Sequence, residues 1–386
     1  MTLLSPILFI WIIAIIAAAW LLPRKWQGYS ISLITGSFML VYVPVSFGIL
    51  TVTTIITYYL SKKQQKNASV VVLMTGLITA ILLYYKLQSN IYWLNASTEH
   101  LIPLGLSYYS FRQIHYIFEN YKGKLPKHNL GDYINYLFFL PTLFIGPIHR
   151  FPTFHRYLHR RRWDPQMVSE GLERILYGYV KIVFLANYLV GEIFFKVVKY
   201  SSIGHSLISE YLESLQYGMN LYFQFSGYSD VAVGLSLILG FRIIENFNFP
   251  FLAINISDFW RRWHISLSDW CRDYVYMPVA SVSRKPILGI ITSFLVLGLW
   301  HAVSYQYLAW GLYHGFGIAT WHLFQKIKPK LPQVKNKYAK LLGRLFANCI
   351  TMNFVIVGFF ITKEPDLASV WGNLKYLIGL IYFRYV

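Results

Sequence analysis

Uncharged stretches long enough to cross a lipid bilayer constrain this chain more than any other feature. Residues 30–60 carry no charged side chain. At about 1.5 Å per residue, one helix of this length would exceed a ~30 Å hydrocarbon core by half, so the segment predicts a helical hairpin that turns near Pro44. Hydrophobic residues make up 56% of the 386 residues and charged residues 13%, as is typical of multi-span membrane proteins. The sequence therefore predicts an all-α polytopic membrane protein.

Further apolar runs extend this pattern along the chain. Leu3 to Leu22 is followed by Arg24 and Lys25 and has no basic residue before it, the reverse of a cleaved signal peptide, so we expect a retained first helix. The later runs cover residues 70–87, 172–198, 221–239, 287–300, 307–324, 346–362 and 370–383. Together they predict roughly ten or eleven crossings. Gly and Pro interrupt residues 138–150, where a short segment is expected to enter and leave on one face.

The excess of basic residues indicates membrane topology. Thirty-five Lys and Arg against sixteen Asp and Glu give a formal net charge of +19, but these residues cluster between the apolar runs, as the positive-inside rule expects. The main clusters are Lys62, Lys63 and Lys66; Arg150, Arg156 and Arg160 to Arg162; and residues 326–344. They predict a membrane protein with its N-terminus outside and its C-terminus inside. We expect these basic residues to contact anionic lipid headgroups, and we do not expect the protein to bind nucleic acid.

The chain is expected to form a single integral-membrane domain. Residues 1–100 would supply N-terminal helices, residues 101–325 the catalytic core, and residues 326–386 a basic cytoplasmic loop with C-terminal helices. The two cysteines, Cys271 and Cys349, provide neither a disulfide framework nor a thiolate metal site. No metal ligand is predicted.

The stretch DFWRRWHISLSDWCRDYVYMP (residues 258–278) places an unusual group of polar residues in this apolar chain. Its aromatic and apolar residues follow helical spacing and form one stripe that includes His264, while Arg261, Arg262 and Asp269 fall mostly on the other side. The pattern predicts one amphipathic helix. One interpretation is an interfacial helix at the cytoplasmic headgroups, anchored by tryptophan and with arginines on lipid phosphate.

His301 is a second candidate for a functional residue. It follows an apolar run of about 15 residues, roughly 22 Å of helix, so it is expected to lie inside a ~30 Å hydrocarbon core. An ionisable side chain there is a functional candidate, and a structural histidine bonded to Ser or Tyr is the alternative. His314, thirteen residues further on, lies on nearly the opposite helix face and is expected to be structural.

Motifs for several common chemistries are missing from the sequence. It has no G-x-S-x-G, no H-E-x-x-H and no Walker loop, which disfavours hydrolase, metalloprotease and nucleotide-driven functions. Acyl transfer from a thioester to a hydroxyl needs only a base, donors for the oxyanion and a dry site. Two histidines, one within the membrane and one on a re-entrant amphipathic helix, satisfy the need for a base.

Several segments, taken in order, resemble one family. FQFSGYSDVAVGLSLILGFRIIENFNFPFLAINISDFWRRWHISLSDWCRDYVYMP, then LGLWH and WGLYHG, with the earlier IPLGLSYYSFRQIHYIFENYKG and FIGPIHRF, are similar to the membrane-bound O-acyltransferases. The resemblance is to the bacterial branch with the alginate O-acetyltransferases and the D-alanyl transferase of teichoic acid synthesis. It covers about Tyr29 to Phe360.

The resemblance implies catalytic roles for His301 and His264, and a fold of helices around a central tunnel that admits a cytoplasmic acyl donor. The supporting or donor-binding candidates are Arg261, Arg262, Arg272, Asp273 and Asp230. For the arginines, pairing with lipid or aspartate is the alternative, and Asp230, Arg272 and Asp273 are alternatively structural polar groups that hold helices together. No bound cofactor is expected.

The expected activity is O-acylation, most of all O-acetylation, of an extracytoplasmic cell-envelope polysaccharide with acetyl-CoA as donor. D-alanyl transfer to teichoic acid from a carrier-protein thioester is the alternative. Either activity implies an accessory membrane or exported protein that passes the acyl group to the polymer. Two alternatives belong to other classes of protein. A lipid-linked sugar transporter would require inverted repeats and paired buried carboxylates. A non-catalytic scaffold would keep its function without His301.

Overall fold

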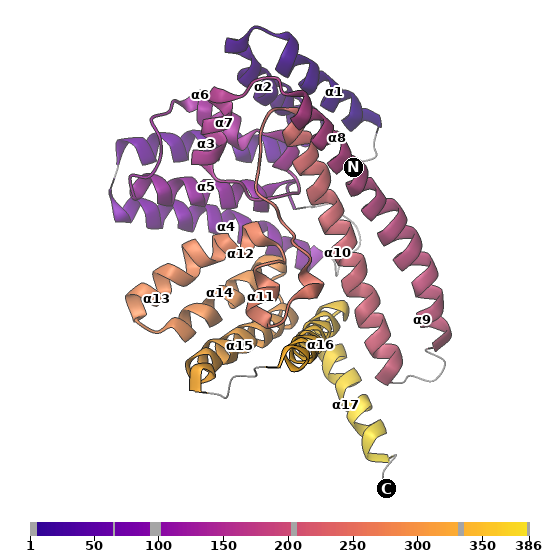
Figure 1. The fold of residues 1–386 in the computed structure, drawn as a ribbon. Coiled ribbons are helices and arrows are strands. Elements are labelled where there is room, and N and C mark those ends of the chain that lie inside the picture. The colour runs from indigo at the N-terminus through magenta and orange to yellow at the C-terminus, as the bar shows by residue number, and fades with distance from the viewer. Residues whose placement is uncertain (1–5, 65, 93–101, 202–206, 331–335, 384–386) are drawn as a thin grey trace. The chain divides into compact units, whose positions relative to one another are not determined.

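The computed structural model describes residues 6–64, 66–92, 102–201, 207–330 and 336–383. Helices dominate this part of the chain and it contains no strand (Figure 1). The predicted all-α fold is therefore confirmed. The chain divides into two compact units: residues 1–178 with 228–245, and residues 179–227 with 246–386. The predicted single domain and its internal boundaries remain a prediction.

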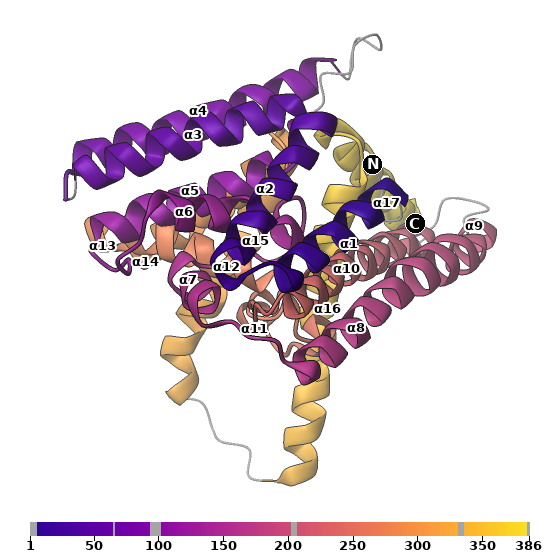
Figure 2. The ribbon, with the colours of Figure 1, turned by 90° about the horizontal axis from the view of Figure 1, so that it is seen from above.

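The first unit is built mainly from the N-terminal helices. α3 and α4 run side by side (Figure 2), and α5 packs against both of them. The helices of this unit are α1 (Pro6–Leu21), α2 (Arg24–Tyr42), α3 (Pro44–Lys63), α4 (Ala68–Tyr92), α5 (Leu106–Tyr121), α6 (Leu130–Leu137), α7 (Phe151–Arg160) and α8 (Pro165–Tyr179), with the 3₁₀ turn η1 (Leu140–Thr142).

The hairpin predicted near Pro44 is confirmed. α2 ends at Tyr42 and α3 begins at Pro44, with Val43 in a non-helical conformation (φ −144°, ψ 59°) between them. Proline suits the first position of a helix because its missing N–H would have no intrahelical partner there. The break predicted within residues 138–150 is also present. The chain follows an irregular path from α6 to α7, and the turn η1 is the only helical element along it.

The second unit contains the remaining helices. Its elements begin with the π-helical segment η2 (Val180–Phe194), α9 (Phe195–Ser201) and α10 (Leu207–Ile238), which continues into the first unit after Gly227. They continue with η3 (Pro250–Leu252), α11 (Ile256–Trp260), α12 (Ile265–Cys271), η4 (Arg272–Tyr276), α13 (Met277–Ser283), α14 (Pro286–His301), α15 (Tyr305–Ile327), η5 (Lys328–Lys330), α16 (Lys337–Lys363) and α17 (Leu367–Phe383). α14 and α15 pack against each other over most of their length.

Three helices among the described residues are long and apolar enough to cross a membrane. They lie at Pro44–Lys63, Ala68–Gln88 and Lys337–Lys363, and two shorter apolar helices cover Pro6–Leu21 and Pro286–His301. This agrees with a membrane protein. The predicted number of crossings, and the side on which each end lies, remain predictions.

The prediction of one continuous amphipathic helix around His264 is wrong. α11 ends at Trp260, α12 starts at Ile265, and His264 between them has a left-handed backbone with φ of +44°. The helical bond pattern stops because the N–H of Ile265 donates to the carbonyl of Asn246 (2.9 Å), and the carbonyl of Arg262 accepts from Asn248 (2.9 Å). Asn246 and Asn248, which lie in a segment without regular secondary structure, thus replace the intrahelical partners.

The predicted stripe is nevertheless buried. Its seven members are all less than 9% exposed: Trp260, Trp263, His264, Leu267, Trp270, Cys271 and Tyr274. Trp263 lies against Phe259, Phe247 and Tyr222 of the same unit. The tryptophans therefore pack inside the protein, which differs from the interfacial interpretation, in which they anchor in lipid headgroups.

Candidate active site

The hydrogen bonds around His264 define the tautomer of its imidazole. Its Nδ1 lies 3.1 Å from the side-chain oxygen Oδ1 of Asn246, which also accepts from the backbone N–H of Ser266 (3.3 Å) and from the Ser266 hydroxyl (2.8 Å). Because a backbone N–H only donates, the Asn246 atom is the amide oxygen, and His264 must carry its proton on Nδ1. The Nε2 atom then has the free lone pair.

The Nε2 atom of His264 is placed to accept a proton. It is buried and has no hydrogen-bond partner among the described residues, and His264 as a whole is 3% exposed. Burial lowers the pKa of His264 well below its ordinary value, and the nearby His301 lowers it further. The imidazole is therefore neutral at neutral pH, the form that a general base needs.

His301 ends α14 and lies among aromatic rings. Its ring centroid is 4.5 Å from that of Trp300, 5.6 Å from Tyr307 in a stacked arrangement, and 5.3 Å from Trp310 edge-on. The ring of Trp300 is also 6.0 Å from His264. The structure thus brings the two predicted histidines together around one tryptophan within the second unit. The side chain of His301 is exposed, and its predicted place inside the membrane remains a prediction.

His314 is buried beside this group, and its contacts agree with the structural role expected for it. Its Nδ1 lies 3.3 Å from the indole Nε1 of Trp260, and its ring contacts Trp310 and Phe354. The bond holds the buried side chain of Trp260 in place. No proton-relay role is needed to explain this histidine.

A cavity of about 490 Å³ lies beside the candidate site in the second unit. The volume falls in the usual range for small-molecule sites, about 300 to 1,000 Å³. Its apolar side comes from α14, with Ile290, Phe294 and Leu297, and its polar side includes Arg261 and Arg272. The cavity therefore combines an apolar wall with cationic side chains.

The predicted arginines differ in their pairing. Arg262 forms an ion pair with Asp258 (2.9 Å). Arg272 pairs with Asp269 (2.5 Å) and with Asp273 (3.0 Å). Arg261 is exposed and forms no ion pair within the described part of the chain. Aspartate pairing, one of the alternatives for these residues, thus applies to Arg262 and Arg272, and Arg261 keeps its charge available.

Asp230 belongs to the first unit, whereas His264 and His301 belong to the second. It is 6% exposed, and its carboxylate lies 2.6 Å from Arg174, which also pairs with Glu245 (2.6 Å). This agrees with the structural role weighed as its alternative. A role for Asp230 in donor binding stays a prediction.

Two residues near the histidines were missed by the sequence analysis. Asn246 lies 18 positions before His264 and carries no motif of its own, so no local signal identifies it. Trp300 is part of LGLWH, and its position directly before His301 was an available signal. Cys271 is not an alternative nucleophile, because burial raises the pKa of its thiol to about 12.

The chain belongs to the membrane-bound O-acyltransferase family, whose model matches residues 37–361. It is 35% identical over 280 residues to the probable alginate O-acetylase of Pseudomonas aeruginosa, covering 71% of this chain and 51% of that protein. It is 32% identical over 333 residues to the teichoic acid D-alanyltransferase of Bacillus subtilis, covering 80% and 81%.

A third relative is the peptidoglycan O-acetyltransferase of Helicobacter pylori, with 27% identity over 406 residues, 93% of this chain and 74% of that protein. The chain spans about half the length of the alginate O-acetylases that it matches. The predicted family is confirmed, and the match includes both His264 and His301. Membership favours acyl transfer over the transporter and scaffold alternatives.

Proposed function

We propose that this protein is an O-acyltransferase that moves an acetyl group from cytoplasmic acetyl-CoA toward hydroxyls of an extracytoplasmic cell-envelope polysaccharide. The observation that carries the proposal is the pair of histidines grouped around Trp300, one of them with an unpartnered Nε2, within the region that matches the family. A neutral imidazole in a dry site is the group that acyl transfer to a hydroxyl requires.

In the proposed reaction, the acceptor hydroxyl oxygen attacks the thioester carbonyl and its proton passes to a histidine. His301 takes this role because its side chain is accessible. The C–S bond then breaks, and the departing CoA thiolate receives the proton as the ester forms. Only one proton moves in this reaction, and His264, held by Asn246, is the second histidine proposed as able to take it. General-base catalysis of this kind contributes about 10²- to 10⁴-fold.

The donor is proposed to bind at the cavity beside the site. Arg261 offers an unpaired cation to an anionic donor such as the phosphates of CoA, and the apolar wall of α14 excludes water. Arg272, held in an ion pair with Asp273, would line the polar side of the same cavity.

D-alanyl transfer to teichoic acid is the second candidate function, with a D-alanyl carrier protein as donor. One observation favours it. The match covers 81% of the Bacillus subtilis D-alanyltransferase but 51% of the Pseudomonas aeruginosa alginate O-acetylase.

The proposed setting is the bacterial cytoplasmic membrane, with the N-terminus outside and the C-terminus inside. The basic clusters between apolar runs support this orientation. An accessory membrane or exported protein would carry the acyl group onward, and membrane lipids surround the helices.

The experiment compares the wild-type protein, His301→Ala and the control His322→Ala, a histidine of α15 outside the site. Each is purified in detergent or nanodiscs and mixed with radiolabelled acetyl-CoA and an envelope-polysaccharide fraction. We expect thioester consumption and label transfer by the wild type and His322→Ala, with a loss of at least about 10²-fold in an equally folded His301→Ala.

Other outcomes separate the candidates. If only D-alanyl carrier protein is consumed, the second candidate replaces the first. Equal rates in wild type and His301→Ala would exclude the proposed base. Consumption of neither donor would exclude both functions.

A further inference from the structure

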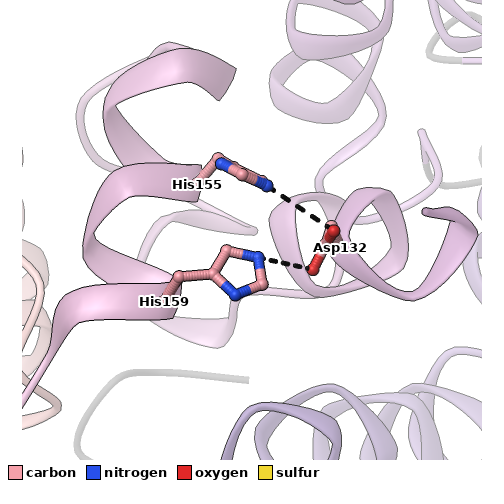
Figure 3. Close-up of side chains that lie close together, drawn as sticks. All are labelled: Asp132, His155 and His159. Atoms are coloured by element: carbon pink, nitrogen blue, oxygen red, sulfur yellow. Dashed lines mark ion pairs between the residues drawn. The ribbon is translucent and has the colours of Figure 1, made fainter. Parts of the chain in front are cut away.

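Two histidines of α7 and an aspartate of α6 converge in the first unit, whereas His264 and His301 belong to the second unit. His155 and His159 are four residues apart on one helix, so both side chains lie on the same face. Figure 3 shows both imidazoles directed at the carboxylate of Asp132. One Asp132 oxygen lies 3.6 Å from Nε2 of His155, and the other lies 3.0 Å from Nε2 of His159.

These separations suit a shared metal ion. Zinc binds imidazole nitrogen and carboxylate oxygen at about 2.0 to 2.2 Å, which places two ligand atoms of a tetrahedral site about 3.3 to 3.5 Å apart. The two carboxylate-to-imidazole distances bracket that value, and all three ligand atoms lie within 4.8 Å of one another. A small rotation of the half-exposed His159 would complete the approach.

The local structure holds the ligands in place. Asp132 is 8% exposed at its side chain and closes a capping box with Asn129, whose backbone N–H donates to the carboxylate (3.1 Å). Such an outer hydrogen bond orients a metal ligand. The His159 side chain is 53% exposed, which leaves an entry path and an open coordination position.

His155 supplies a second, independent indication of a ligand. Its Nε2 atom is buried and has no hydrogen-bond partner among the described residues, because 3.6 Å from Asp132 is too long for a hydrogen bond. An imidazole nitrogen with a free lone pair is the atom that binds a metal ion.

We propose that Asp132, His155 and His159 form a binding site for a divalent transition metal of the zinc class, which ties α6 to α7. Two imidazoles and one carboxylate favour zinc or its neighbours over Mg²⁺ and Ca²⁺, which prefer oxygen ligands. The sequence analysis named no metal ligand, although the H-x-x-x-H spacing in FHRYLH was present. The site is independent of the proposed acyl transfer.

The ion would act on the fold rather than on the acyl group. α6 and α7 flank residues 138–150, the irregular segment between them. An ion bound to both helices fixes the two ends of this segment, and it stabilises the folded state by mass action.

The test uses full-length protein without a histidine tag, stripped with chelator and kept in detergent. It is titrated with CoCl₂, whose tetrahedral sites absorb visible light, and with ZnCl₂, followed by metal analysis after desalting. We expect one equivalent of either metal, a visible cobalt band, and a zinc-dependent rise in Tm. His159→Ala should weaken binding by about 100-fold or more, since removing a ligand costs more than removing an outer-shell partner.

The matched control is His322→Ala, which should bind metal as the wild type does. His155→Ala and Asp132→Asn should also lose the cobalt band. Because His159 is half exposed, its variant is expected to fold, and gel filtration checks this. Absence of binding to the wild type, or equal binding by wild type and His159→Ala, would overturn the proposal and leave an imidazole–carboxylate hydrogen bond in its place. Acyl transfer is measured separately, so either proposal can fail alone.

Discussion

The Nδ1 atom of His264 lies 3.1 Å from the side-chain oxygen of Asn246. This contact fixes the proton on Nδ1 and leaves Nε2 as the basic nitrogen. Asn246 also receives two bonds from Ser266, so one amide positions both the imidazole and the start of α12. Asn246 is therefore a positioning residue for the proposed reaction.

Replacing Asn246 by leucine should remove the acceptor while keeping the size of the side chain. We expect kcat to fall by about 10²-fold, within the range for general-base catalysis, with KM for the acyl donor nearly unchanged. Asn246→Asp keeps an acceptor for Nδ1 and should retain more activity than Asn246→Leu. Steady-state kinetics of thioester consumption measures both. A rise in KM with kcat intact would instead place Asn246 in donor binding.

Stability should depend on pH through His264. In the unfolded chain its pKa is near the ordinary ~6.5, whereas burial keeps the folded imidazole neutral to a much lower pH. Below ~6.5 the unfolded state binds a proton that the folded state does not, so the free energy of unfolding falls as the pH is lowered, by about 1.4 kcal/mol per pH unit. The loss continues until the folded-state pKa is reached.

The measurement is the apparent Tm, followed by tryptophan fluorescence in detergent from about pH 7.5 to about pH 5.5. The wild type should lose Tm more steeply than His264→Asn, a variant chosen because asparagine tolerates the positive φ at this position. Parallel slopes for the two proteins would show that His264 is not the group that resists protonation.

The glycines of LGLWH and WGLYHG allow α14 and α15 to approach closely. A Cβ atom at Gly298 would collide with the carbonyl of Tyr307, and one at Gly311 would lie 2.5 Å from the carbonyl of Phe294. Small residues serve this purpose between helices in membranes. We expect Gly298→Ala to destabilise the protein by about 1 to 3 kcal/mol and to reduce activity, because His301 lies one turn further along α14.

The control for this variant is Gly343→Ala in α16, where an added Cβ would contact nothing within 4 Å. Its stability should stay the same or rise by up to about 1 kcal/mol, since alanine favours a helix over glycine. Thermal unfolding followed by size-exclusion chromatography compares the two variants. Equal tolerance of both would contradict the close packing at Gly298.

Arg261 should affect donor binding more than the chemical step. Arg261→Gln removes the unpaired cation at the cavity, so KM for acetyl-CoA should rise by about 3- to 10-fold at low salt, while kcat changes little. The difference should shrink at high salt, where exposed charges are screened. Lys285→Gln, an exposed cation at the start of α14, serves as the charge-matched control and should leave KM unchanged.

The sequence by itself determined the helical membrane fold and the neighbourhood of the site. Apolar runs specify helices because every backbone polar group must be bonded within a span, and Pro44 specifies a boundary because its ring ends one helix and suits the start of another. The stripe around His264 is buried as its periodicity predicts. The family resemblance identified His264 and His301, which the fold brings together around Trp300.

Only the tertiary structure decided how these residues are bonded. The break at His264 arises because Asn246 and Asn248 supply backbone partners from a distant segment, and the pairing of Arg262 and Arg272 depends on local geometry. The same holds for Asp132, His155 and His159, which meet only when α6 packs on α7. The periodicity of apolar residues indicates which helix faces are buried. Hydrogen bonds and clusters of metal ligands depend instead on distances of a few ångströms between segments that are remote in sequence.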